Sequence, residues 1–78
     1  MNSSKGTVVK NWVKLERARI DITQRQLAEA IGVSVQTINI IEKNKVKPSY
    51  ITAVKIANYF KLPISEIFIL EEDINHNS

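Results

Sequence analysis

The sequence predicts an all-α domain of five short helices, and three observations support this prediction. Apolar residues recur at helical spacing along most of the chain, as expected of helices that bury one face. Residues that can cap a helix through a side-chain hydroxyl precede three of the apolar runs, at Thr23, Ser34 and Ser49. Cysteine is absent, so helix packing rather than disulfides has to hold the fold.

A single domain fills most of the chain, because 78 residues leave room for one small core. We expect a flexible N-terminus over residues 1–6, the folded domain over residues 7–70 and an acidic flexible tail over residues 71–78. No stretch reaches the roughly 20 apolar residues of a membrane helix. The N-terminus lacks the apolar segment of a signal peptide. The sequence therefore indicates a soluble cytoplasmic protein without a membrane partner.

The first helix is predicted over residues 8–19, with Thr7 as its cap. Its apolar residues form two neighbouring stripes, namely Val8, Val9, Trp12, Val13, Leu15 and Ile20. Trp12 is expected in the core or at its rim, and a dimer or partner surface is the alternative. Glu16 falls between the stripes, so it either pairs with a cation or extends to the rim. Asp21 marks the end of this helix.

The second and third helices are predicted over Gln24–Ile31 and residues 35–43. Gly32 lies between them and can adopt the left-handed conformation that ends a helix. Small or apolar residues at fixed intervals allow the two helices to cross closely: Leu27, Ala28, Ile31, Ile38 and Ile41. Two short helices joined by a tight turn are typical of a helix-turn-helix, whose second helix enters the DNA major groove.

Two further helices complete the predicted fold. Asn44 suits a left-handed helix exit, and Pro48 prevents the third helix from continuing. The fourth helix is predicted over Tyr50–Phe60, with an inner face of Tyr50, Ala53, Val54, Ala57 and Phe60. The fifth is predicted over residues 63–69, with Ile64, Ile67 and Phe68 as its anchors. A short strand over residues 67–70 is the alternative.

The segment TQRQLAEAIGVSVQTINIIEK and the EKNKVKPS that overlaps its end resemble the Cro and phage-repressor type of helix-turn-helix protein, the XRE family. The resemblance covers roughly residues 9–70. It implies a lambda-repressor-like domain of five helices, with the helix-turn-helix at the second and third, that binds DNA and regulates transcription. The chain departs from the family at Glu16, where an apolar residue is usual, and at Asp21, where glycine or asparagine is common.

By position in the family, the base-reading residues would be Val35, Gln36 and Ile40, with Asn39 beside them. Gln36 can form two hydrogen bonds with the N6 and N7 of adenine, a pairing that contributes about 1–3 kcal/mol of discrimination. Val35 and Ile40 can press on thymine methyl groups, and the alternative is that they pack within the protein. Relatives often have arginine or glutamine at those two positions, so the operator sequence does not follow from the resemblance.

Contacts with the DNA phosphates are expected from residues at the helix starts and beyond the third helix: Gln24, Ser34, Thr37, Asn44, Lys45 and Lys47. The charge distribution agrees with this placement. Residues 1–50 hold nine Lys and Arg against four acids, whereas residues 51–78 hold two against four. A basic half suits contact with nucleic acid, although an ordinary solvated surface would look the same in the sequence.

The resemblance also implies a homodimer that binds two half-sites about one helical turn apart. The candidate dimer surface is the apolar segment Ile67, Phe68, Ile69 and Leu70, and the alternative is that these residues close the monomer core.

A structural salt bridge is expected between Arg17 and Glu42. Glu42 lies at the carboxyl end of the third helix, where a negative charge is unfavourable with the helix dipole, so a cation should lie nearby. Related domains often pair an arginine and a glutamate at these two positions. Two independent solvated side chains are the alternative.

Residues suited to catalysis are sparse. The single histidine, His76, is in the tail, and no glycine-rich phosphate loop or clustered metal ligands occur. We therefore expect no enzyme activity, no metal, no cofactor and no small-molecule ligand. Two functions remain open: a sequence-specific transcriptional regulator, as repressor or autoregulator, and a protein-interaction or antitoxin-like module with the same fold. Binding to DNA should weaken steeply with salt, whereas an apolar protein interface should not.

Overall fold

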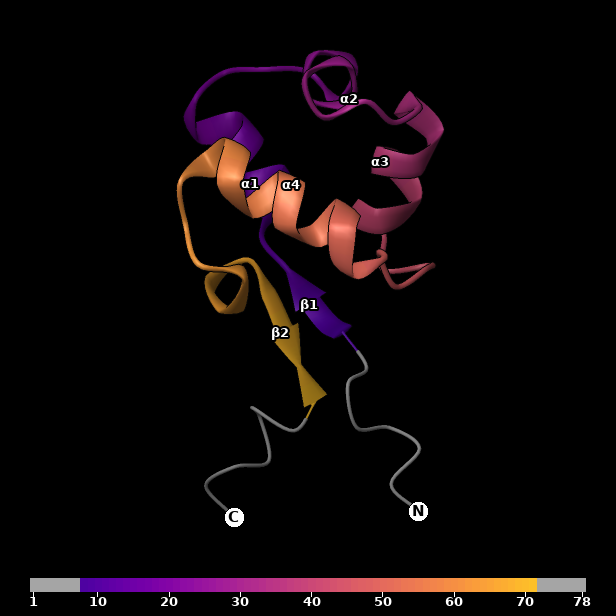
Figure 1. Ribbon diagram of the computed structural model, residues 1–78, viewed down its shortest axis with the longest axis vertical. Coiled ribbons are helices and arrows are strands. Elements are labelled where there is room, and N and C mark those ends of the chain that lie inside the picture. Colours follow the sequence, from indigo (N-terminus) through magenta and orange to yellow (C-terminus); the bar gives the residue numbers. More distant parts are fainter. Residues whose placement is uncertain (1–7, 72–78) are drawn as a thin grey trace.

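The computed structural model describes residues 8–71, in which helices gather around one core and two strands pair at the end remote from α2 (Figure 1). The elements follow in this order: β1 (Val8–Asn11), α1 (Val13–Arg19), α2 (Gln24–Ile31), α3 (Val35–Glu42), α4 (Tyr50–Phe60), the 3-10 turn η1 (Ile64–Glu66) and β2 (Phe68–Leu70). The predicted flexible N-terminus, the Thr7 cap and the tail from residue 72 lie outside the described residues.

The prediction of five helices is wrong, since the described chain has four α-helices and a two-stranded sheet. The first predicted helix is too long, because its first four residues form β1 and the helix begins only at Val13. β1 pairs with β2 in antiparallel register, with Val8 opposite Leu70 and Asn11 opposite Phe68. Two adjacent valines favour extended backbone once a partner strand is available, and here tertiary pairing outweighs the helical spacing.

The fifth predicted helix is also wrong, and the short strand that was its alternative is present. Pro63 precedes a single turn, in which the Glu66 amide donates to the Pro63 carbonyl at 3.0 Å. The chain then extends through β2, whose aromatic and branched residues suit a strand. The third predicted helix is one residue too long, since Lys43 is its cap.

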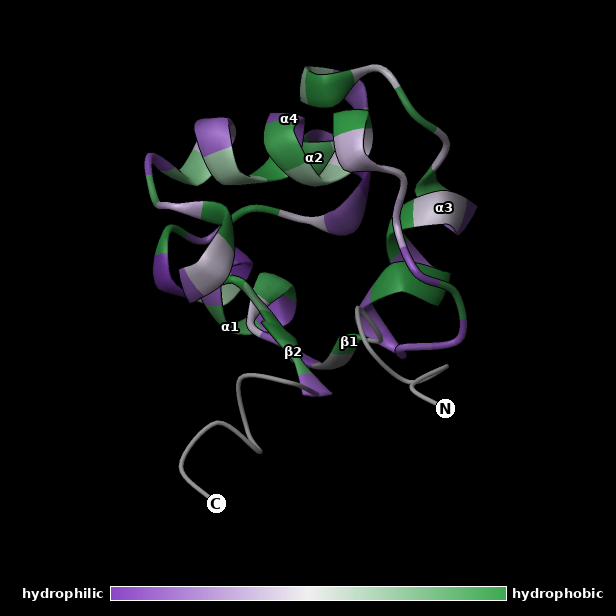
Figure 2. Cartoon of the chain, turned by 60° about the horizontal axis from the view of Figure 1, so that its bottom comes forward, coloured by the Kyte–Doolittle hydropathy of each residue, from purple (hydrophilic) through white to green (hydrophobic). Residues whose placement is uncertain are grey.

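The core consists of apolar side chains from all four α-helices and from the start of β2 with the residue before it. Figure 2 shows apolar and polar residues on different sides of the helices. Its buried members are Val13, Leu27, Ala28, Ile31, Ile38, Ile41, Ala53, Ile56, Ala57, Phe60, Ile67 and Phe68. Tyr50 was predicted on the inner face of α4 but is 77% exposed, because the first residue of that helix lies beyond the edge of the core. Trp12 is 36% exposed and lies at the rim.

The caps predicted from the sequence are confirmed. Thr23 forms a capping box with Gln26, and the hydroxyls of Ser34 and Ser49 each accept from the amide three residues later. A residue with positive φ follows each of the four helices within two positions, namely Asp21, Gly32, Asn44 and Lys61. Among residues 8–71, none of the helices is long and apolar enough to cross a membrane.

Candidate nucleic-acid interface

The crossing of α2 and α3 depends on a small residue and a left-handed turn. Ala28 is 1% exposed and lies in the core that α2 shares with α3, where a larger side chain would separate the helices. Gly32 has a φ of +77°, and the Val33 amide behind it donates to the Ala28 carbonyl at 3.0 Å. Ile38 and Ile41 then fix α3 on the core side. These contacts leave the opposite side of α3 facing outward.

The amino end of α3 is held by its own residues. Ser34 Oγ accepts from the Thr37 amide at 3.0 Å and lies 2.9 Å from Thr37 Oγ1. Ser34 is exposed and Thr37 half-buried. Both hydroxyls, which were predicted to contact phosphates, therefore take part in hydrogen bonds at the helix cap.

The four predicted base-reading residues differ in exposure. Gln36 is exposed, and Asn39 and Ile40 are half-buried. Val35 packs against the hydrophobic core, so packing within the protein, which was the alternative for this residue, describes its side chain. Gln36 is the member of the set with a free polar group on the outward side of α3, since its amide has no partner among the described hydrogen bonds.

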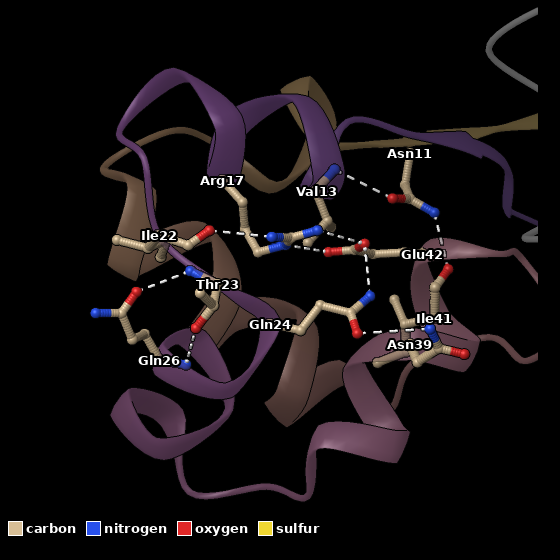
Figure 3. A network of polar contacts seen from close by, with 10 residues as sticks. All are labelled: Asn11, Val13, Arg17, Ile22, Thr23, Gln24, Gln26, Asn39, Ile41 and Glu42. Atoms are coloured by element: carbon tan, nitrogen blue, oxygen red, sulfur yellow. Dashed lines mark hydrogen bonds and ion pairs between the residues drawn. The ribbon is translucent and has the colours of Figure 1, made fainter.

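The carboxyl end of α3 is held by a network of distant residues centred on Glu42 (Figure 3). Arg17 Nε lies 2.6 Å from Glu42 Oε2, and Arg17 Nη2 donates to Glu42 Oε1 at 3.0 Å. Arg17 Nη1 also donates to the Ile22 carbonyl at 3.0 Å. The two side chains are 14% and 4% exposed, so the ion pair is largely shielded from water. The hydrogen bond to Glu42 raises the pKa of Arg17 although burial acts against it.

Gln24 belongs to the same network. Its Nε2 donates to Glu42 Oε1 at 3.0 Å, and its Oε1 accepts from Asn39 Nδ2 at a long 3.5 Å (Figure 3). The side-chain amide of Gln24, predicted from its place at a helix start to contact a phosphate, therefore bonds within the protein. It orients Asn39, one of the predicted base-reading residues, from the neighbouring helix.

Lysines that the sequence reasoning missed surround this network. Lys14 of α1 and Lys43 at the end of α3 line a shallow hollow of about 180 Å³ together with Arg17, Gln24, Asn39 and Glu42. Both lysines are exposed, as is Arg25 in the first turn of α2. In the sequence, these cations contribute to the positive charge of residues 1–50. That total charge does not indicate which of them lie on the same face of the folded domain.

The loop after α3 presents the remaining predicted phosphate contacts. Asn44 adopts a φ of +57°, and exposed Lys45 and Lys47 follow it. Asn44 Oδ1 accepts from Asn11 Nδ2 at 2.8 Å. Asn11 was not singled out from the sequence, because it was placed inside the first helix rather than at the end of a strand.

The predicted dimer surface is wrong in part. Ile67 is 0% and Phe68 3% exposed, so both belong to the monomer core, which was the alternative for this segment. Ile69 and Leu70 are half-buried in β2. Next to β2 lies an apolar hollow of about 360 Å³, lined by Val8, Lys47, Pro48, Tyr50, Ala53, Ile64, Ser65, Phe68 and Leu70.

Comparison with known proteins places this architecture in a family. A family model described as helix-turn-helix matches residues 13–67. An uncharacterised HTH-type transcriptional regulator of Methanocaldococcus jannaschii is 49% identical over 65 residues, which are 83% of this chain and 98% of that protein. The uncharacterised HTH-type transcriptional regulator YgzD of Bacillus subtilis is 42% identical over 65 residues, again 83% and 98% of the two chains. The chain therefore belongs to the XRE type of the helix-turn-helix family.

Proposed function

We propose that this protein is a transcriptional regulator that binds double-stranded DNA sequence-specifically, with α3 in the major groove. The observation that supports this most is the exposed amide of Gln36, on the outward side of a helix with a local cap at its amino end and an ion pair to α1 at its carboxyl end. A rigid helix presents such a group in one position relative to a base edge, as sequence readout requires. The regulators from Methanocaldococcus jannaschii and Bacillus subtilis support the proposal by their names.

The proposed phosphate contacts flank α3 on both sides. Lys45 and Lys47 are exposed beyond its carboxyl end, and Ser34 is exposed at its amino end. Lys14 and Lys43 add positive charge beside Asn39. Such contacts would fix the register of the protein on the duplex, and Gln36, Asn39 and Ile40 would then meet base edges.

We place the protein on DNA as a homodimer that acts as a repressor or autoregulator by occupying two half-sites. One such domain buries only about 600–1,000 Å² on DNA, so a second copy would add affinity and a defined spacing. The dimer surface we propose combines half-buried Ile69 and Leu70 with the apolar hollow beside them, where Tyr50 is 77% exposed.

Selection of bound sites from random duplex DNA tests this proposal. The expected result is a motif with two symmetric half-sites, a 2:1 complex by sedimentation, and binding that weakens steeply as salt rises. Enrichment of no motif, with salt-independent or absent binding, would overturn it.

A protein-interaction or antitoxin-like module is the second candidate, and half-buried Ile40 on the outward side of α3 favours it. Val35 no longer supports this second candidate, because its side chain packs against the core and does not face a partner. Substitution of Ile40 by Ser separates the two candidates. In a DNA reader it should alter preference at one base position, whereas in a protein-binding module it should abolish partner binding, and the unmodified chain should show no preference among DNA sequences.

A further inference from the structure

Asn11 joins the sheet to the end of α3 and to the loop that follows. It is the last residue of β1, and its side chain uses both of its polar atoms (Figure 3). Oδ1 accepts from the Val13 amide at 3.1 Å, at the start of α1. Nδ2 donates to the Ile41 carbonyl at 2.9 Å and to Asn44 Oδ1 at 2.8 Å, 30 and 33 residues away. One side chain therefore holds three elements together.

The two bonds from Nδ2 complete the exit of α3. The Asn44 amide donates to the Ile41 carbonyl at 2.9 Å and the Lys45 amide to the Ile40 carbonyl at 3.0 Å, with Asn44 left-handed, as in a Schellman motif. The Ile41 carbonyl thus accepts from the Asn44 amide of the turn and also from Asn11 Nδ2 of a distant element. Within residues 8–71, the bond to Asn11 is also the one side-chain hydrogen bond between residues 43–48 and another element.

We infer that Asn11 is a positioning residue for DNA binding, which sets the direction of the Asn44 turn and thereby places Lys45 and Lys47 against the phosphates. This inference rests on the proposed function. It differs from the role of Glu42, which fixes α3 itself, because Asn11 fixes the loop beyond α3. Loss of its donor would leave the helix in place and allow the loop lysines to sample more directions.

The test replaces Asn11 by Ser in the full chain. Serine can still accept from the Val13 amide two residues later, as serine does in a turn, but it is too short to reach Ile41 and Asn44. DNA affinity should fall roughly tenfold on the selected site and on random duplex alike, with the specificity ratio unchanged. The slope of log affinity against log salt should become shallower by about one, as when a phosphate contact is lost. A purely structural role would lower the unfolding temperature and leave this slope unchanged in the folded protein.

Two comparisons make the test decisive. In a chain that already has Lys45→Ala and Lys47→Ala, Asn11→Ser should cause no further loss of affinity, and an equal loss there would overturn the inference. NMR order parameters of the residue 44–47 amides, measured without DNA, should fall in Asn11→Ser but not in Ser34→Ala. Unchanged order parameters would overturn it as well. If these amides loosen and no variant, nor the unmodified chain, binds DNA, the proposed function fails while the positioning of the loop stands.

Discussion

The two ends of α3 are held in different ways. At the amino end, Ser34 and Thr37 bond to each other within one turn, and both are open to solvent to some degree. At the carboxyl end, Glu42 is held by Arg17 from 25 residues away, and the Ile41 carbonyl by Asn11 from 30 residues away. The polar groups at the amino end, where Gln36 lies, thus bond only to near neighbours in the chain, while the carboxyl end is bonded to distant parts of the molecule. The exposed residues at the amino end, such as Gln36, can therefore change without loss of the fold.

The largest expected effect on stability is at the carboxyl end of α3. Glu42→Gln leaves the guanidinium of Arg17 shielded and without its counter-charge, so the free energy of unfolding should fall by about 3–5 kcal/mol. Urea unfolding of Arg17→Met, Glu42→Gln and the double variant measures the coupling. The double variant should be less destabilised than the sum of the single ones, since it strands neither charge. A coupling energy of zero would show that the network does not fix α3.

A smaller effect, on specificity alone, is expected at the amino end of α3. Gln36→Ala should lose about 1–3 kcal/mol of discrimination for the selected site over random DNA. Its stability should stay within about 0.5 kcal/mol, because the side chain is an exposed surface group. Competition binding at fixed salt measures the ratio. Lys45→Ala is the matched control, which should weaken both DNAs equally. An unchanged ratio in Gln36→Ala would remove α3 as the reading element.

The cap at the amino end of α3 should contribute modestly to stability. Ser34→Ala removes the acceptor for the Thr37 amide, and caps of this kind contribute about 1 kcal/mol. Thermal unfolding measures the loss, and Ser49→Ala, which removes the equivalent cap of α4, is the control. A loss as large as that of Glu42→Gln would contradict the difference between the two ends.

The smallest effect is expected at a helix exit that touches neither end of α3. Lys61 ends α4 with a φ of +60°, which favours glycine. Lys61→Gly should therefore stabilise the protein by roughly 0.5–1 kcal/mol after the entropy of the unfolded chain is counted. Gly32→Ala should do the reverse, because its φ is +77° although nothing lies within 4 Å of an added Cβ. If both variants were as stable as the unmodified chain, the positive φ at these two helix exits would carry no strain.

Local signals made the centre of the fold predictable from the sequence. Thr23, Gly32 and Ser34 act through bonds with residues three or four positions away, so their roles can be recognised in a short window. The role of Asn11 and strand β1 could not be predicted in this way, because β1 forms only through pairing with β2 near the other end of the described chain. Val8 and Val9 fit the apolar spacing of a helix, and they are extended because the partner strand β2 is available for pairing. Likewise, burial of Val35 and the orientation of Gln24 depend on neighbours from other elements.

The pairing of Val8 with Leu70 also has a consequence for the rate of folding. Bringing Val8 and Leu70 together closes almost the whole described chain into a loop, which costs more entropy than forming contacts between α2 and its sequence neighbour α3. The helix-turn-helix can therefore assemble in the transition state, while the sheet completes afterwards. Substitutions in β1 should then accelerate unfolding and leave the refolding rate nearly unchanged, which a chevron plot would measure. The sheet is then expected to slow the unfolding of the helix-turn-helix without affecting how fast it forms.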